Sequence, residues 1–293
     1  MSLIINHNLM AMNAARSLNI SYSRLATSVQ RLSSGLRVSS AQDDAAGLAV
    51  REMMRTDIAT INQGVRNAND AVSMIQTADG ALSVVDEKLT RMKELAEQAA
   101  TGTYTTAQRA IMDSEYQAMA SEITRIANAT DFNGVKLLDG SLSGSGVDGT
   151  AGNQMKIHFG TGNSSAEDYY YVKIGTATAS ALGVGNSAAV GAGYTISTQS
   201  AAQCSLDAIN SAINTKDGIR ANLGALANRL SNTVSVLSIQ AENLQSAESQ
   251  ISDVDVATQM TEFTRNQGLV QAGVAMLAQA NSLPALALRL LGG

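Results

Sequence analysis

Few residues in this 293-residue sequence have the type and spacing that chemistry requires. The segment GSGVDG at 144–149 matches GxGxxG, a pattern that can hold a dinucleotide pyrophosphate at the N-terminus of a helix. A dinucleotide site needs a strand before this turn and a helix after it, but glycine, threonine and asparagine follow here. We therefore interpret 144–149 as a flexible loop and expect no cofactor.

The sequence does not favour metal binding or nucleophilic catalysis either. It contains no HExxH, no GxxxxGK[ST] and no Cys/His cluster with the spacing of metal ligands. Cys204 has only His7 and His158 as candidate partners, so we interpret it as a small buried apolar residue. Acidic pairs such as Asp43/Asp44 are expected at helix ends. We predict neither an enzyme nor a metal site.

Composition points to long helices whose surfaces are not all meant to face water. Charged residues make up 15% of the chain, against about 25% in a typical domain, and there is one proline. The net charge of −5 argues against a general nucleic-acid binder, which needs a basic surface. The uncharged stretch 266–288 is interrupted by polar residues and Pro284, so we expect no membrane insertion. No cleavable signal peptide is recognisable.

Heptad spacing of hydrophobic residues predicts a helix at each end of the chain. Such a seam is narrow enough to face one or two partner helices, and we expect the two end helices to pair antiparallel. The predicted seam consists of Ala11, Ala15, Leu18, Tyr22, Leu25, Val29, Leu32 and Leu36 at the N-terminal end, and of Val256, Met260, Phe263, Val270, Val274 and Leu277 at the C-terminal end.

Longer inner helices follow the same periodicity, over 58–92, 112–126 and 223–251. Ser40 and Asp43 fit a capping box at the start of the second helix, and SDVD at 252–255 separates the last two helices. The predicted fold is therefore mainly α. We expect a long antiparallel coiled-coil helical rod formed by both chain ends.

The middle of the chain, from 131 to about 194, loses the helical period. Asn133-Gly134 is a tight-turn signal, and apolar residues alternate with other residues over 155–159 and 170–174, as in short strands. We predict a small β-rich, outward-facing insertion at the tip of the rod.

Three non-enzymatic classes fit this pattern. One is a self-assembling structural protein. Another is an isolated helical hairpin that carries the β-rich insertion at its tip. The third is a membrane-surface or signalling coiled coil, because residues 1–42 contain arginines but no acid. The narrow, alanine-rich face of this segment and its lack of lysine favour packing between helices.

Several stretches at both ends closely resemble bacterial flagellin. They are INHNLMAMNAARSL, QRLSSGLRVSSAQDDAAGLAV, NQGVRNANDAVSMIQTADGAL, ANATDFNGVKLL and AMLAQANSLP, and the similarity covers roughly 1–140 and 200–290. The resemblance implies a subunit of the extracellular flagellar filament that serves motility and is exported unfolded by the flagellar type III apparatus, a route that needs no cleavable signal. A hook–filament junction protein of the same family is the alternative, but TDFNGVKLL and AQANSLP favour flagellin itself.

The resemblance also implies a division of the chain into segments. Residues 1–42 would be an N-terminal core helix paired with a C-terminal core helix at 255–293, and the predicted seam would serve self-assembly. The remaining segments would be N-terminal tube helices and a β-turn segment at 43–140, a short variable outer region at 141–200, and a C-terminal tube helix at 201–254.

Partners follow from the resemblance as well. They are many copies of the chain itself, an export chaperone at the last helix (256–291), the filament cap and hook-associated proteins, and the flagellin-sensing Toll-like receptor of a host. The resemblance implies receptor contacts at Arg91 and Leu95, within the motif TRMKELAEQ, and at Glu115 on the helix after it. Arg91 and Leu95 are one helical turn apart and are expected on one face. The alternative is that Arg91 pairs with Glu87 and Leu95 packs inside the rod.

Overall fold

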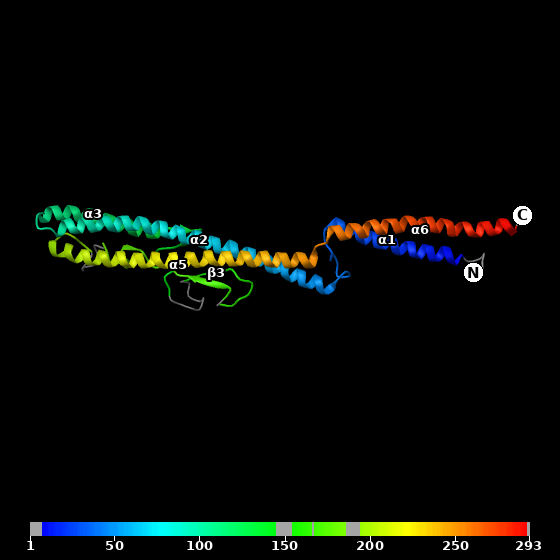
Figure 1. The fold of residues 1–293 in the computed structure, drawn as a ribbon. Coiled ribbons are helices and arrows are strands. Elements are labelled where there is room, and N and C mark those ends of the chain that lie inside the picture. Colours follow the sequence, from blue (N-terminus) through cyan, green and yellow to red (C-terminus); the bar gives the residue numbers. More distant parts are fainter. Residues whose placement is uncertain (1–7, 145–153, 166, 186–193, 292–293) are drawn as a thin grey trace. The chain divides into compact units, whose positions relative to one another are not determined.

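The computed structural model describes residues 8–144, 154–165, 167–185 and 194–291, with side chains up to residue 282 (Figure 1). Most of the GSGVDG segment lies outside the described residues. The elements, in chain order, are α1 (Leu9–Ser34), α2 (Ala45–Ala100), α3 (Thr106–Ala129), β1 (Asp131–Phe132), β2 (Val135–Lys136), β3 (Met155–His158), β4 (Tyr169–Val172), α4 (Ala179–Leu182), α5 (Gln199–Ser252) and α6 (Val256–Leu291). The mainly helical fold predicted from the sequence is confirmed.

The chain forms two compact units. The terminal unit comprises Met1–Ile58 and Glu242–Gly293, and the inner unit comprises Ala59–Ala241. The boundaries between the units fall inside α2 and α5, so each of these helices contributes residues to both units.

The inner unit has an apolar core between α2, α3 and α5. One cluster joins these helices with α4, and a second joins α2 and α5 with the strands. Heptad residues of the sequence, such as Leu82, Leu89 and Ile123, are fully buried there. Arg109 is also buried, and its guanidinium donates to the carbonyl oxygens of Ala99 and Thr101, both at 2.8 Å. These bonds satisfy carbonyl groups that the end of α2 leaves without helical partners.

The predicted turn and short strands are present, and they form two hairpins. The β1–β2 pair is closed by Asn133 and Gly134, with φ angles of 50° and 82°, as a two-residue hairpin turn with positive φ at both central positions requires. β3 and β4 pair antiparallel, with Ile157 opposite Tyr170.

The predicted position of the β3–β4 hairpin at a tip is wrong. The hairpin lies along α5 (Figure 1), and Asn67 of α2 donates to the carbonyl oxygen of His158 at 2.9 Å. A Cβ at Gly64 would lie 2.0 Å from the carbonyl oxygen of Phe159, so only glycine admits the hairpin backbone here. The physical reason is the apolar inner face of the hairpin, where Phe159 and Val172 are buried against the helices.

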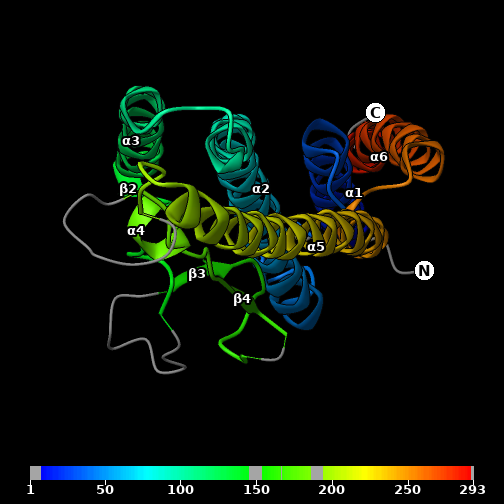
Figure 2. The ribbon, with the colours of Figure 1, turned by 90° about the vertical axis from the view of Figure 1, so that its left-hand side faces the viewer.

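In the terminal unit, α1 and α6 lie side by side and antiparallel (Figures 1 and 2). Asn8 Nδ2 donates to the carbonyl oxygen of Ala280 at 2.7 Å near one end of the pair. At the other end, Leu36 forms an isolated antiparallel bridge with Asp253. The predicted antiparallel pairing of the two chain ends is confirmed.

Two details of the α1–α2 linker differ from the predictions. α1 ends at Ser34 and is capped by Gly35 with φ 72°, so Leu36 lies beyond the helix that was expected to include it. α2 starts at Ala45, and Asp44 Oδ1 accepts from the backbone N–H of Gly47 at 2.9 Å. Asp44 is therefore the N-cap, and the capping box predicted for Ser40 and Asp43 is wrong.

Asp43 instead closes the linker turn itself. Its carboxylate accepts from the backbone N–H groups of Ser39 and Ser40, at 3.3 and 3.1 Å, and from both hydroxyls. The hydrogen bonds from Ser40 hold the pKa of Asp43 below its usual value.

Among the described residues, no helix is long and apolar enough to cross a membrane.

Candidate self-assembly surface

The contact between α1 and α6 follows a heptad pattern, and one set of its positions coincides with residues of the predicted seam. These positions recur every seven residues and carry the larger apolar side chains, which are buried or half-buried. They are Ala11, Leu18, Leu25 and Leu32 on α1, and Phe263, Val270 and Leu277 on α6.

The second set of positions in the contact differs from the prediction. The structure places small or polar residues there, each seven residues from the next. They are Ala14, Ser21 and Ser28 on α1, and Gln259, Asn266, Gly273 and Ala280 on α6. Of the apolar residues predicted for this second set, Ala15 is half-buried, whereas Tyr22, Val29, Met260 and Val274 are each between 46% and 49% exposed. Val256, seven residues before Phe263 and so in the first set, is 60% exposed.

Small side chains occupy most of these positions because they let the two helices approach closely. A Cβ at Gly273 would lie 3.1 Å from Leu18 Cδ1, which is tighter than ordinary van der Waals contact. Asn266 and Ser28 are both buried, and Asn266 Nδ2 donates to Ser28 Oγ at 3.4 Å. Larger apolar residues at these positions would push α1 and α6 apart.

Four of the displaced apolar residues therefore form an unpartnered seam in the terminal unit. We call Tyr22, Val29, Met260 and Val274 the open seam. Each directly follows a residue of the α1–α6 contact and lies about 100° further around its helix. Other large apolar residues of this unit are also exposed: Leu9, Met10, Met12, Ile20, Val50, Met53, Val256, Leu269 and Met276. Exposed apolar surface of this extent marks an interaction site.

Backbone hydrogen bonds join the α1–α2 linker to the α5–α6 junction at one end of the α1–α6 contact. The backbone N–H of Arg37 donates to the carbonyl oxygen of Ser252 at 2.7 Å, and that of Val254 donates to the carbonyl oxygen of Gly35 at 3.0 Å. Arg51 is buried, and its Nη1 donates to the carbonyl oxygen of Val38 at 2.7 Å. The sequence reading missed these contacts, because backbone acceptors leave no pattern in a sequence.

Asp255 starts α6 as its N-cap. Its carboxylate accepts from the hydroxyl of Thr258 at 2.6 Å and from the backbone N–H of Ala257 at 3.0 Å. The hydrogen bonds from Thr258 lower the pKa of Asp255. The acidic break predicted at 252–255 is thus a capped helix start.

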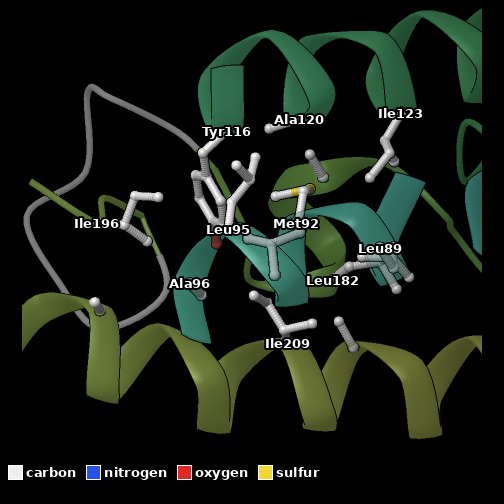
Figure 3. Close-up of a cluster of buried hydrophobic side chains, with 14 of the residues drawn as sticks. Leu89, Met92, Leu95, Ala96, Tyr116, Ala120, Ile123, Leu182, Ile196 and Ile209 are labelled. Atoms are coloured by element: carbon white, nitrogen blue, oxygen red, sulfur yellow. The ribbon is translucent and has the colours of Figure 1, made fainter. Parts of the chain in front are cut away.

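The three candidate receptor contacts lie in different surroundings. Arg91 is exposed on α2; its Nη2 lies 2.9 Å from Glu115 Oε1 of α3, and its Nη1 lies 3.0 Å from Glu94 Oε2. Leu95 is 2% exposed and lies inside the core near Tyr116 (Figure 3). The expectation that Arg91 and Leu95 share one accessible face is therefore wrong. The ion pairs of Arg91 run to Glu94 and Glu115 rather than to Glu87, the partner considered from the sequence.

Two further observations concern chemistry. Among the described residues, no group of three or more His, Cys, Asp or Glu side chains could hold a metal ion. Cys204 is exposed on α5 and not buried as predicted, because the residues of α5 that enter the core are its neighbours Ala202 and Ser205.

Comparisons with known proteins identify the family. Residues 5–143 match the bacterial flagellin N-terminal helical region, and residues 206–291 match the C-terminal helical region. Flagellin FlaB1 of Treponema pallidum is 41% identical over 280 residues, which cover 96% of each chain. The flagellar filament 33 kDa core protein of Treponema phagedenis is 40% identical over 292 residues, which cover 99% of this chain and all of that one.

A solved structure shares the fold. It is assigned as a flagellar hook-associated protein of Vibrio parahaemolyticus, has 16% sequence identity and a TM-score of 0.55, and covers 72% of this chain and 100% of that chain. Identity this low shows the fold alone. The two family matches and the relatives at about 40% identity show that this chain belongs to the bacterial flagellins, which are structural filament proteins and not enzymes.

Proposed function

We propose that this chain polymerises with copies of itself through the open seam, and that the resulting extracellular filament serves motility. The observation that supports this most is the exposure of Tyr22, Val29, Met260 and Val274 beside a contact made of small and polar residues. A neighbouring copy would complete a second apolar seam on each helix. The relative from Treponema phagedenis carries the name of a filament core protein.

The physical driving force is burial of apolar surface. Each square ångström removed from water contributes roughly 25 cal/mol, and a half-exposed Tyr or Val has substantial area left to bury. If the neighbour covers the open seam with a different surface, the contact is heterologous. Heterologous contacts that do not close into a ring give an open helical filament.

Electron microscopy of the purified protein after heating and slow cooling tests this function. We expect long filaments from the unchanged chain, and few or none after Tyr22→Ser combined with Val274→Ser. Circular dichroism of the free subunit should be the same for both proteins. A chain that stays monomeric when seeded with fragments of its own filaments would contradict the proposal. Short rings in place of long filaments would favour the hook–filament junction alternative.

Export and the remaining partners are further parts of the proposal. Residues 1–42, which contain no acid, would serve as the export segment for the type III apparatus, and α6 would bind the export chaperone before assembly. Such binding would cover the same exposed apolar residues that later meet a neighbouring subunit. A chain lacking residues 256–291 should lose chaperone binding in a pull-down, and retained binding would refute this assignment. The cap and hook-associated proteins would meet the subunits at the ends of the filament.

Recognition by the host Toll-like receptor is proposed for the Arg91–Glu115 surface alone. Arg91 and Glu115 are accessible side chains on adjacent helices, whereas Leu95 supports them from the core. Arg91→Ala should reduce the response in a receptor reporter assay. Arg125→Ala is the matched control, because Arg125 is an exposed arginine of α3 that also pairs with a glutamate, Glu122. Equal responses from the two variants would rule out this surface.

A further inference from the structure

Methionines are distributed unequally between the two units. The sequence has 12 methionines, of which all but Met1 are described. In the inner unit, every methionine belongs to a core or packs against one: Met74, Met92, Met112, Met119 and Met155. In the terminal unit, by contrast, five are between 46% and 68% exposed: Met10, Met12, Met53, Met260 and Met276.

The exposed methionines belong to the surface that assembly would use. Met260 is part of the open seam, and Met276 follows Leu269 by seven residues on the same exposed side of α6. Met10 and Met12 lie in the first turn of α1, where Leu9 is also exposed. The flexible, polarisable thioether suits contacts that must adapt to a neighbour. These five are the exposed methionines of the described chain, and Cys204 is an exposed sulfur-containing residue as well.

We propose that these five methionines are oxidation sites that control assembly, and that the oxidant is a peroxide. Each reaction transfers one oxygen atom to Sδ. The peroxide O–O bond breaks, an S=O bond forms, and hydrogen peroxide leaves as water. The sulfur loses two electrons and the peroxide gains them. Only free subunits expose these sulfur atoms, so oxidation acts before assembly. This inference rests on the proposed polymerisation through the terminal unit.

Oxidation converts an apolar side chain into a strongly polar one. A sulfoxide buried between subunits without a hydrogen-bond donor loses its hydration, whereas in the free subunit it stays in water. Oxidation therefore disfavours the filament and leaves the fold of the free subunit intact. Because methionine sulfoxide is reduced enzymatically, the block is reversible.

The experiment compares free subunits and preformed filaments treated with the same hydrogen peroxide concentration. Peptide mass spectrometry should find the five exposed methionines oxidised first in free subunits, with Met74 and Met92 oxidised last. The critical concentration for seeded assembly, measured by sedimentation, should rise at least about tenfold. Treatment with both stereospecific methionine sulfoxide reductases should restore it. Filaments treated in the same way should remain largely unoxidised at these positions.

Leucine variants separate the sites. Replacement of all five exposed methionines by leucine should preserve assembly and remove the effect of peroxide, whereas Met112→Leu with Met119→Leu should leave the effect unchanged. An unchanged critical concentration despite complete oxidation of the five residues would overturn the inference, as would equal oxidation in filaments and subunits. The repair step tests the inference even if the fivefold variant assembles poorly. Failure of untreated subunits to assemble would refute the proposed function itself.

Discussion

The terminal and inner units differ in how far their long helices bury apolar side chains. In the inner unit, three helices and a hairpin enclose Leu82, Leu89 and Tyr116 completely. In the terminal unit, two helices can cover only one face of each other. The buried positions there go partly to small or polar residues, such as Ser28 and Asn266. The large apolar residues beside them stay in water.

This difference shows what each unit needs in order to be stable. The inner unit buries two continuous apolar clusters within one chain, so its stability is a property of the single subunit, although Ile111, Val236 and Ile239 are exposed on its surface. In the single subunit, the terminal unit leaves much of its apolar surface unburied. If assembly covers the open seam as proposed, the ends of the subunit gain further stability when a neighbour binds.

The largest expected effect comes from an identical substitution made in both units. Leu82→Ala removes a fully buried side chain of α2, whereas Leu269→Ala removes a side chain of α6 that is 47% exposed. We expect Leu82→Ala to lower the free energy of unfolding of the free subunit by about 2–5 kcal/mol. Leu269→Ala should change it by less than about 0.5 kcal/mol. Urea titrations followed by circular dichroism measure both, and equal losses would contradict the contrast between the units.

An intermediate effect is expected from the buried polar pair between α1 and α6. Ser28→Ala leaves Asn266 Nδ2 without its partner at 3.4 Å, and the buried amide should cost about 1–3 kcal/mol of unfolding free energy. Adding Asn266→Leu should recover part of that loss, because no buried polar group then remains unpaired. A double-mutant cycle gives the coupling energy of the pair. A coupling near zero would mean that the two residues merely fill space.

The smallest effect concerns the ion pairs of the inner unit. Arg220 of α5 binds Asp79 of α2 with Nε at 2.7 Å and Nη2 at 3.2 Å, and this hydrogen bonding lowers the pKa of Asp79. A lowered pKa stabilises the fold above the unfolded-state value near 3.8, and this stabilisation is lost as the pH falls through the folded-state pKa.

Asp79→Asn should therefore cost less than about 1 kcal/mol at pH 7, because the pair is partly exposed. The difference from the unchanged chain should shrink as the pH falls below about 3.8 and disappear below the lowered folded-state pKa. Unfolding titrations at a series of pH values measure this, and the exposed Asp207→Asn on α5 is the matched control. A cost for Asp79→Asn that stays constant down to pH 2 would show that the ion pair is not its source.

Periodicity was enough to predict the helices, their antiparallel pairing at the chain ends and the short strands of the middle region. It could not choose between two overlapping seams on α1, because Leu18 and Leu25 belong to both. The sequence reading took the more hydrophobic alternative, Tyr22 and Val29, whereas the structure uses Ser21 and Ser28. That choice depends on how closely two helices approach, which is a property of the pair and not of one helix.

The burial of Leu95 and the position of the β3–β4 hairpin could not be predicted from the sequence for a related reason. Leu95 and Arg91 have the spacing of one helical face, but α3 covers Leu95 and leaves Arg91 accessible. The position of the β3–β4 hairpin depends on a glycine, Gly64, that a sequence reading does not distinguish from other helical glycines. Tertiary cover of this kind cannot be read from spacing alone.

The critical concentration of a Val29→Asn variant tests the central claim most directly. Val29 is 48% exposed in the open seam, whereas Ser23 on the same helix is an exposed polar residue outside it, so Ser23→Asn is the control. If the open seam is covered by a neighbouring copy, Val29→Asn should raise the critical concentration of seeded assembly about tenfold or more, since a polar side chain would then be buried. Ser23→Asn should change it little, and both free subunits should keep their helical content. Equal critical concentrations for the two variants would contradict the account.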